Sequence, residues 1–177
     1  KKIIKTLSIV VPVFNEEESI TETVRRLLVL QEKLASELDV ELVFVDDGSK
    51  DGSLSLLRSI AEKSPSVKII SFSRNFGHQI AITAGIDLCT GDYVAVIDAD
   101  LQDPPELIED MYRLAQSGFD VVYGKRRSRA GETVFKKITA AAFYRVLGYM
   151  CELDIPPNTG DFRLMSRKVV DAFKQLR

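Results

Sequence analysis

Residues 93–105 read YVAVIDADLQDPP, an apolar run that ends in acidic residues and is followed by two prolines. Val, Ile and Tyr without intervening charges are typical of a short strand that is buried on both faces. Pro104 and Pro105 suit the first turn of a helix, where a missing N–H costs nothing, and Asp103 is then the predicted N-cap. The stretch therefore predicts a strand, an acidic turn and a helix that ends at Gly118.

The same alternation of strand and helix runs along most of the chain. Strands are predicted at Leu7–Val13, Val40–Val45, Val67–Phe72, Tyr93–Ile97 and Asp120–Tyr123. Helices are predicted at Glu18–Leu38, at Gly52–Lys63 behind an Asp51 cap, and at Gln79–Leu88. Strands that alternate with helices form parallel β-α-β units. The predicted fold class is therefore α/β, with an open, mostly parallel sheet and helices on both faces.

The composition fits one globular domain. The chain has 177 residues, 45% hydrophobic and 28% charged, which is typical of a folded protein and not of a disordered one. Its net charge of -2 gives no general attraction to nucleic acid, and no apolar stretch approaches the roughly 18 residues of a membrane-spanning helix. Cys89 and Cys151 fit no metal-ligand spacing, which favours a reducing compartment. The missing initiator Met and the uncapped, helical-looking end lead us to expect a piece of a longer protein.

The acidic turn after Tyr93–Ile97 is the strongest chemical signal in the chain. In extended backbone, side chains two residues apart share a face, so we expect Asp98, Asp100 and Gln102 to point the same way. Two carboxylates so close raise each other's pKa unless a cation neutralises them, and oxygen ligands of this kind suit Mg²⁺ or Mn²⁺. A surface turn without a ligand is the alternative. We favour a metal site that accepts the diphosphate of a nucleotide substrate.

The first predicted strand ends in residues 12–18, which read PVFNEEE. A dinucleotide-binding protein would place a glycine-rich turn here, but the chain has no glycine before Gly48. The glutamates would repel a bare phosphate, so a bridging metal would be needed. Pro12, Asn15 and Glu16 are candidates for lining a nucleotide pocket, although glutamates also complement a helix N-terminus.

The second predicted strand is followed by Asp46 and Asp47, and then by Gly48 and Ser49. A carboxylate at the end of a second parallel strand commonly holds a ribose hydroxyl or a base edge. Asp, Gly and Ser are also turn formers, so a plain turn is the alternative. We expect one of the two aspartates to contact a nucleoside.

With these motifs the chain resembles the family 2 glycosyltransferases of the GT-A fold. Within that family it resembles the polyprenyl-phosphate glycosyltransferases, which are the dolichyl-phosphate mannose synthases and the bacterial undecaprenyl-phosphate glycosyltransferases. The resemblance rests on six pieces in order: VPVFNE at 11–16, VDDGS at 45–49, SRNFG at 73–77, DADLQDPP at 98–105, GKRR at 124–127 and GDFRL at 160–164. The SRNFGH run leans toward the undecaprenyl-phosphate branch, with a UDP-sugar donor.

The resemblance implies a Rossmann-like GT-A catalytic domain over residues 1–177, with a donor-binding half at about 1–123 and an acceptor side at about 124–177. It implies inverting sugar transfer from a UDP-sugar to undecaprenyl phosphate. It would place around the nucleoside Pro12, Asn15, Glu16 and Asp46 or Asp47. Asp98 would lie at the ribose–diphosphate junction, and Asp100 and Gln102 would bind the Mg²⁺ or Mn²⁺, with Asp98 as a further metal ligand. Family members usually carry membrane helices after the catalytic domain, which implies a location at the cytoplasmic face of the membrane.

Residues 124–145 form a basic block, in which seven Lys and Arg residues stand against Glu132. Apolar residues recur behind it at helical spacing, which predicts an amphipathic helix on a membrane surface. A helix packed on the sheet is the alternative, and a nucleic-acid patch would need a broader positive face. Arg126, Arg129 and Arg163 could neutralise a lipid phosphate, which is largely ionised near neutral pH and needs no general base. Asp161 would orient an arginine or the sugar.

Several alternatives stay open. The donor could be GDP-mannose, as in the dolichyl-phosphate mannose synthases, or the acceptor could be a saccharide hydroxyl, with Asp161 as the leading general base. The chain could also bind a nucleotide sugar without catalysing transfer. His78, the single histidine, is expected to be structural or to line the donor site. The sequence predicts neither the sugar nor whether the protein forms a homo-oligomer.

Overall fold

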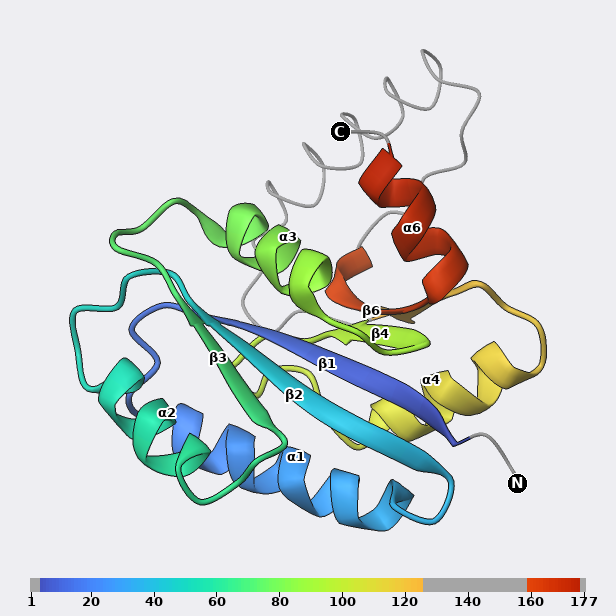
Figure 1. Cartoon of the computed structure of the whole chain (residues 1–177), viewed down its shortest axis with the longest axis horizontal. Helices are drawn as coiled ribbons and strands as arrows, with labels where there is room; N and C mark the ends of the chain where they lie inside the picture. The colour runs from blue at the N-terminus through green and yellow to red at the C-terminus, as the bar shows by residue number, and fades with distance from the viewer. Residues whose placement is uncertain (1–3, 126–158, 176–177) are drawn as a thin grey trace, which may run out of the picture. The chain divides into compact units, whose positions relative to one another are not determined.

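The computed structural model describes residues 4–125 and 159–175, which form a six-stranded sheet and five helices (Figure 1). The strands are β1 (Lys5–Val13), β2 (Leu38–Asp46), β3 (Val67–Ser71), β4 (Tyr93–Val96), β5 (Val121–Lys125) and β6 (Thr159–Ser166). The helices are α1 (Ile20–Leu34), α2 (Ser53–Ala61), α3 (His78–Leu88), α4 (Leu107–Gln116) and α6 (Arg167–Gln175). Along the sheet the strand order is β3-β2-β1-β4-β6-β5.

Strand pairing brings the functional strand ends together. β1 pairs in parallel with both β2 and β4, and β2 pairs in parallel with β3. In this register Val13 lies opposite Asp46, so the acidic end of β2 is next to the end of β1. β4 pairs antiparallel with β6, where Val96 lies opposite Arg163. The prediction of an open, mostly parallel sheet is confirmed.

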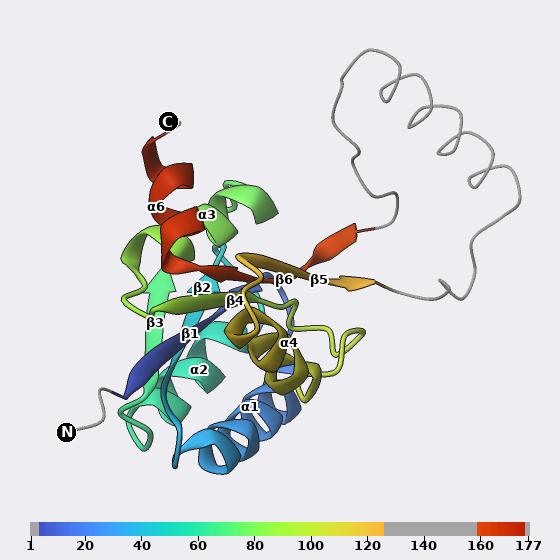
Figure 2. The ribbon, with the colours of Figure 1, turned by 90° about the vertical axis from the view of Figure 1, so that its right-hand side faces the viewer.

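Successive residues of each central strand face different helix layers, because side chains alternate along a strand. Leu7, Ile9 and Val11 of β1 belong to the core that also contains buried residues of α1, α2 and α4. Val10 belongs to a second core, shared with buried residues of α3 and α6. Figures 1 and 2 show α1, α2 and α4 on one face of the sheet and α3 and α6 on the other. Both faces are covered, which explains why these strands carry apolar residues on both faces.

Two helix N-caps differ from the prediction. α2 begins at Ser53 with Gly52 at the cap position, and the Asp51 carboxylate instead accepts the N–H groups of Ser53 and Glu17, at 3.0 and 3.1 Å. α4 begins only at Leu107, so the prediction that Asp103 caps it is wrong. A residue that precedes proline is disfavoured in helical conformation, which holds residues 103 and 104 outside the helix.

The first helix also ends earlier than the predicted Glu18–Leu38. α1 stops at Leu34, and Leu38 is the first residue of β2. Leu34 and Leu38 are both buried and four residues apart, a spacing that mimics one face of a helix. Because of this apolar spacing, the predicted helix extended past the end of α1 to the first residue of β2.

Strand β6 was not predicted, although its pattern is that of a strand. The side chains of Phe162 and Leu164 are buried in the core that contains residues of α1 and α4. Met165 belongs to the core on the other face of the sheet, which contains residues of α3. Arg167 at the start of α6 donates from Nε to the Gly91 carbonyl oxygen at 2.8 Å, which ties the end of β6 to the start of β4. β6 therefore lies beside β4 and brings Asp161 and Arg163 to the same edge as the acidic turn.

Candidate functional site

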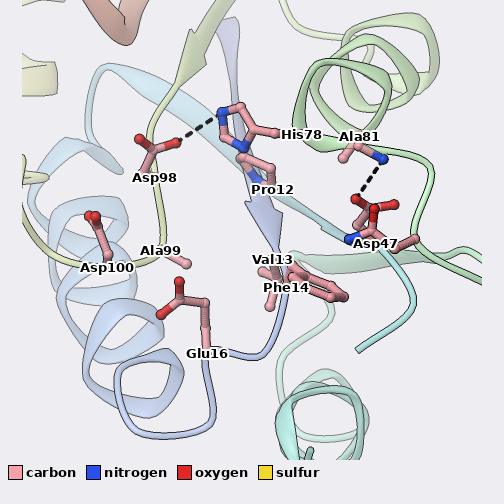
Figure 3. A pocket seen from close by; sticks show the side chains of 12 residues that line it. Pro12, Val13, Phe14, Glu16, Asp47, His78, Ala81, Asp98, Ala99 and Asp100 are labelled. Atoms are coloured by element: carbon pink, nitrogen blue, oxygen red, sulfur yellow. Dashed lines mark hydrogen bonds and ion pairs between the residues drawn. The ribbon is translucent and has the colours of Figure 1, made fainter. Parts of the chain in front are cut away.

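A pocket of about 360 Å³ lies at the carboxyl ends of β1, β2 and β4, the edge where open α/β sheets bind ligands (Figure 3). Its walls come from the loop after β1, the end of β2, the start of α3 and the loop after β4. The lining residues are Pro12, Val13, Phe14, Glu16, Asp47, Asn75, Gly77, His78, Ala81, Asp98, Ala99 and Asp100. Candidate residues from three separate strand ends thus meet around one cavity.

The loop after β1 is held by the loop after β2. Asn15 has a positive φ of 55°, and its Oδ1 accepts the Lys50 N–H at 2.8 Å while its own N–H donates to Ser49 Oγ at 3.0 Å. The Glu16 N–H donates to Ser53 Oγ at 2.8 Å. Asn15 is therefore a turn residue that fixes the loop, and it is not among the pocket-lining residues, whereas Glu16 is.

Asp46 is fully buried and also lies outside the pocket lining. Its Oδ1 accepts the Ser49 N–H at 3.3 Å, and its Oδ2 accepts the Ser71 hydroxyl at 3.2 Å. These contacts join the turn after β2 to the end of β3. Of the two aspartates at this strand end, Asp46 thus serves the local structure.

Asp47 lines the pocket and holds the loop before α3. Its carboxylate accepts the N–H groups of Phe76 and Gly77, at 2.7 and 2.9 Å. The neighbouring Gly48 has φ +69°, and a Cβ there would fall 2.7 Å from Arg74 Cα. The turn after β2 and the loop before α3 are therefore packed backbone to backbone, and only glycine fits at position 48 without displacement.

The turn after β4 is not extended. β4 ends at Val96, and Leu101 adopts a left-handed conformation with φ 59°, which costs roughly 1–2 kcal/mol for a residue with a Cβ. Asp100 Oδ1 accepts the Gln102 N–H at 3.0 Å. The alternation that was expected to align Gln102 with Asp98 and Asp100 is therefore wrong for this turn. Gln102 is exposed and outside the pocket lining, and its binding of a metal stays a prediction.

Asp98 is the carboxyl group of the pocket lining whose pKa is shifted upward. Burial raises the pKa of its carboxyl, the carboxylates of Asp100 and Asp161 raise it further, and His78 acts against this rise. Asp98 Oδ1 is buried without a hydrogen bond, and His78 Nε2 lies 3.5 Å from it, a contact that is ionic only when the imidazole is protonated (Figure 3). The ionised form of Asp98 would thus be stabilised by a cation in the pocket.

The acidic wall fits a divalent cation that is shared with a substrate. Figure 3 shows the carboxyl groups of Asp98, Asp100 and Glu16 on one side of the pocket. Across residues 4–125 and 159–175, no group of three or more His, Cys, Asp or Glu side chains is arranged to hold a metal by itself. Mg²⁺ is commonly held by one or two carboxylates together with substrate phosphates. Two carboxylates, one with an unsatisfied buried oxygen, match that kind of site.

Asp161 on β6 reaches the start of α3. His78 Nε2 lies 3.0 Å from Asp161 Oδ2, and Gln79 Nε2 donates to both carboxylate oxygens at 3.3 Å. Arg163, two residues along the strand, is half-buried, and its Nε is buried without a hydrogen bond. Asp161 and Arg163 share one face of β6, so both candidates from this strand lie on the α3 side of the sheet.

The structure also reveals residues that sequence reasoning missed. His78 lines the pocket, as one of its two expected roles required, but its contacts with both Asp98 and Asp161 were not predicted. Phe14 lines the pocket with an exposed ring, and its place beside Asn15 in the motif was the available signal. Arg126 and Arg129 lie outside the described residues, as does the segment for which a basic amphipathic helix was predicted. Among the helices of the described segments, none has both the length and the apolar character needed to cross a bilayer.

Comparison with known proteins places the chain in a family. The model of glycosyl transferase family 2 matches residues 8–173. The uncharacterized glycosyltransferase YkcC of Bacillus subtilis is 57% identical over 170 residues, which are 96% of this chain and 52% of that protein. The bactoprenol glucosyl transferase of Shigella phage SfV is 44% identical over 170 residues, which are 96% of this chain and 55% of the phage protein. The chain spans about half the length of the curated relatives it matches.

A solved structure shares the fold. The mannosyltransferase PcManGT from Pyrobaculum calidifontis, in complex with GDP-Man and Mn²⁺, aligns with a TM-score of 0.67 at 22% identity. The alignment covers 97% of this chain and 47% of that one. The sheet order, the pocket at the strand ends and these matches agree. The chain belongs to glycosyl transferase family 2 and has the GT-A fold.

Proposed function

We propose that this chain is the catalytic domain of an enzyme that transfers a sugar from a UDP-sugar to polyprenyl phosphate, with inversion at the anomeric carbon and with Mg²⁺ or Mn²⁺. The observation that carries the proposal is the pair of carboxylates of Asp98 and Asp100 on the wall of the strand-end pocket. The relative named bactoprenol glucosyl transferase supports a polyprenyl phosphate acceptor. The homologous stretch covers 96% of this chain, so the similarity includes the pocket.

On the donor side, the residues divide into two groups. Pro12, Glu16 and Asp47 line the pocket and would face the nucleoside. Asn15 and Asp46 would act one step back, by holding the loops after β1 and β2 through the hydrogen bonds of those turns. All five residues thus keep a role at the nucleoside site, three by direct contact and two by supporting the loops.

The cation would be held by Asp98 and Asp100, with Gln102 as a further candidate. When bound, it would neutralise the diphosphate that leaves with the nucleoside. Asp98 and Asp100 would hold the cation and the diphosphate on the side of the pocket opposite the acceptor. Without a cation, the acidic wall would repel the donor, since Glu16 adds a third carboxylate to it.

On the acceptor side, an oxygen of the lipid phosphate would attack the anomeric carbon as the bond from that carbon to the UDP oxygen breaks. The new carbon–oxygen bond forms on the opposite face, and UDP leaves with the electron pair. A phosphate monoester has its second pKa near 6, so it needs no base at neutral pH. It needs positive charge, which Arg163 on β6 would supply, together with Arg126 and Arg129. The acceptor lipid places the reaction at a membrane surface.

The full-length protein tests this proposal directly. UDP- and GDP-sugars would be incubated with undecaprenyl phosphate and Mn²⁺ or Mg²⁺, and lipid-linked sugar would be extracted and quantified. Transfer from a UDP-sugar that stops with EDTA and returns with Mn²⁺ supports the proposal. Transfer from GDP-mannose alone would show that the donor is GDP-mannose and not a UDP-sugar. Hydrolysis of the donor without a lipid product would contradict polyprenyl phosphate as the acceptor.

A second candidate is transfer to a saccharide hydroxyl. The observation that favours it is the hydrogen bond between Asp161 and His78, a residue of the pocket lining, since a carboxylate held beside the pocket could act as a general base. Soluble saccharide acceptors in the same assay distinguish the two cases. Glycosylation of a soluble acceptor, with none of undecaprenyl phosphate, would favour this candidate over the lipid.

A further inference from the structure

The acidic turn after β4 rests on a buried hydroxyl of α1. Thr23 lies in the first turn of α1 and is completely buried, and its Oγ1 is 2.8 Å from the carbonyl oxygen of Ala99. Ala99 stands between Asp98 and Asp100, and it is 2% exposed. The two partners are 76 residues apart in sequence, so the contact joins α1 directly to the turn that carries both carboxylates.

The Thr23 hydroxyl has one proton and two nearby acceptors. Besides Ala99 O, the carbonyl oxygen of Ser19 lies 3.0 Å from Oγ1, but it already accepts the Thr23 N–H at 3.0 Å. Ser19 O could accept a second hydrogen bond, but Ala99 O is the nearer acceptor, at 2.8 Å against 3.0 Å, and accepts no other hydrogen bond from the described residues. The shorter distance favours donation to Ala99 O. A buried hydroxyl without a partner is costly, and valine would fill the same volume without that cost. The hydrogen bond to Ala99 thus explains why a threonine, and not a valine, suits position 23.

The turn needs an outside anchor because its own backbone is strained. β4 ends two residues before Asp98, and Leu101 holds a left-handed conformation that its side chain disfavours. Within the turn, Asp100 Oδ1 and the Gln102 N–H supply one local bond. That bond lies beyond Ala99, whereas the Thr23 contact holds the residue that stands between the two carboxylates.

We propose that Thr23 is a positioning residue that acts through the Ala99 carbonyl to hold Asp98 and Asp100 together on the pocket wall, in the arrangement that binds a divalent cation and the diphosphate of the donor. This inference rests on the proposed function for the identity of the ligand. The geometry of the turn itself is independent of that function.

The test uses three variants of the full-length protein. Thr23→Val keeps the shape and removes the hydroxyl, and Thr23→Ser restores the hydroxyl without the methyl group. Leu30→Val, two turns further along α1, is the control for a small loss of packing, since Leu30 is buried in the same helix and keeps Thr23 intact. If Thr23→Val does not fold, Thr23→Ala takes its place against Thr23→Ser.

The first readout needs no cation and no substrate. Hydrogen–deuterium exchange of a peptide that covers residues 97–103, followed by mass spectrometry, should be about 3- to 10-fold faster in Thr23→Val, as expected for the loss of one buried hydrogen bond. Thr23→Ser should exchange at the wild-type rate, and so should Leu30→Val. Equal exchange in Thr23→Val and the wild type overturns the proposal.

The second readout is binding of Mn²⁺ in the presence of UDP, measured by the electron paramagnetic resonance of the free cation. Thr23→Val should weaken Mn²⁺ binding by about 3- to 10-fold, with rescue by Thr23→Ser and with Leu30→Val unchanged. If Thr23→Val speeds exchange in the turn but leaves Mn²⁺ binding unchanged, the proposal that Thr23 supports cation binding is overturned. If the wild type binds Mn²⁺ but transfers no sugar, while Thr23→Val weakens that binding, Thr23 is confirmed as a positioning residue and the proposed transfer reaction is rejected.

Discussion

The Nε2 atom of His78 lies 3.0 Å from Oδ2 of Asp161, across 83 residues of sequence. His78 is the first residue of α3, and Asp161 lies on β6, so the hydrogen bond joins the helix beside the strand-end pocket to the strand beside the acidic turn. The same nitrogen is 3.5 Å from Asp98 Oδ1. One imidazole thus sets the spacing between a carboxylate of the proposed metal site and a carboxylate of the proposed acceptor side.

Loss of this imidazole should slow transfer more than it weakens nucleotide binding. In His78→Ala, Asp161 loses its shortest hydrogen bond and keeps only the longer contacts of Gln79. A displacement of about 1 Å in a reacting site can lower the rate by roughly 100-fold. We expect kcat to fall by about 10- to 100-fold, with a smaller change in the dissociation constant of UDP. Steady-state kinetics and UDP binding of the full-length protein measure both quantities.

The matched variants are His78→Gln and Gln79→Ala. The glutamine amide can still donate to Asp161, so His78→Gln should retain more activity than His78→Ala. Gln79→Ala removes only the longer contacts of Asp161, at 3.3 Å, and should have the mildest effect. A wild-type kcat in His78→Ala would contradict the role of this bond.

The packing of Gly48 predicts a stability change. In Gly48→Ala, the new Cβ would meet the backbone of Arg74 and Asn75, and the positive φ would add strain. We expect a loss of about 3 kcal/mol in the free energy of unfolding. Gly118→Ala is the control, because Gly118 also has a positive φ but has no atom within 4 Å of its Cβ position. It should lose only about 1–2 kcal/mol.

Urea unfolding curves of the two glycine variants provide the comparison. The difference between them isolates the contact of the turn after β2 with the loop before α3. Equal destabilisation of Gly48→Ala and Gly118→Ala would show that this contact has no energetic role.

Glu41 predicts how stability depends on pH. Its side chain is buried, and although burial opposes ionisation, hydrogen bonds from Lys68, Ser8 and Thr90 outweigh this and lower its pKa from 4.5 to about 2. The native state therefore binds fewer protons than the unfolded state between these values. This contribution is complete above pH 4.5 and is lost as the pH falls toward 2, and it amounts to about 3 kcal/mol.

Glu41→Gln should flatten the decline in unfolding free energy below pH 4.5. Lys68→Met should have a similar but smaller effect, because the hydrogen bonds from Ser8 and Thr90 remain. The measurement is urea unfolding at a series of pH values from 3 to 7. The same decline in Glu41→Gln as in the wild type would exclude Glu41 as its source.

The sequence predicted the parallel part of the sheet because its strands are buried on both faces and bounded by turn residues. The runs around Val43 and Val94 show this pattern, and their ends carry Asp47 and Asp98. The rule that ligands bind at the carboxyl ends of such strands then located the pocket. These inferences needed only local patterns and the general architecture.

Contacts between distant parts of the chain could not be predicted in this way. The pairing of β6 with β4 depends on strand order, and no local pattern shows that Asp161 would meet His78. The burial of Thr23 under Ala99 is likewise set by how α1 packs. The expected alignment of Gln102 failed because Leu101 turns left-handed, which a leucine does rarely.

Loss of Arg163 should weaken binding of the acceptor. In Arg163→Met, a half-buried cation near Asp161 is removed, and a charge-assisted hydrogen bond of about 1.5–3 kcal/mol to the lipid phosphate would be lost. We expect the KM for undecaprenyl phosphate to rise by about 10- to 100-fold, while the dissociation constant of UDP stays near the wild-type value. Arg58→Met, on the exposed side of α2, is the control. A parallel loss of donor and acceptor binding would assign Arg163 to the fold instead.

Asp100 carries the central claim, which is that the acidic wall holds a cation and through it the donor diphosphate. The most direct test is transfer of radiolabelled sugar from a UDP-sugar to undecaprenyl phosphate by the full-length protein with saturating Mn²⁺, comparing the wild type with Asp100→Asn. Asp110→Asn, on the exposed surface of α4, serves as the control. We predict that Asp100→Asn lowers the rate by at least about 100-fold, with an unchanged melting temperature and a normal rate in Asp110→Asn. Transfer by Asp100→Asn at the wild-type rate would contradict the account.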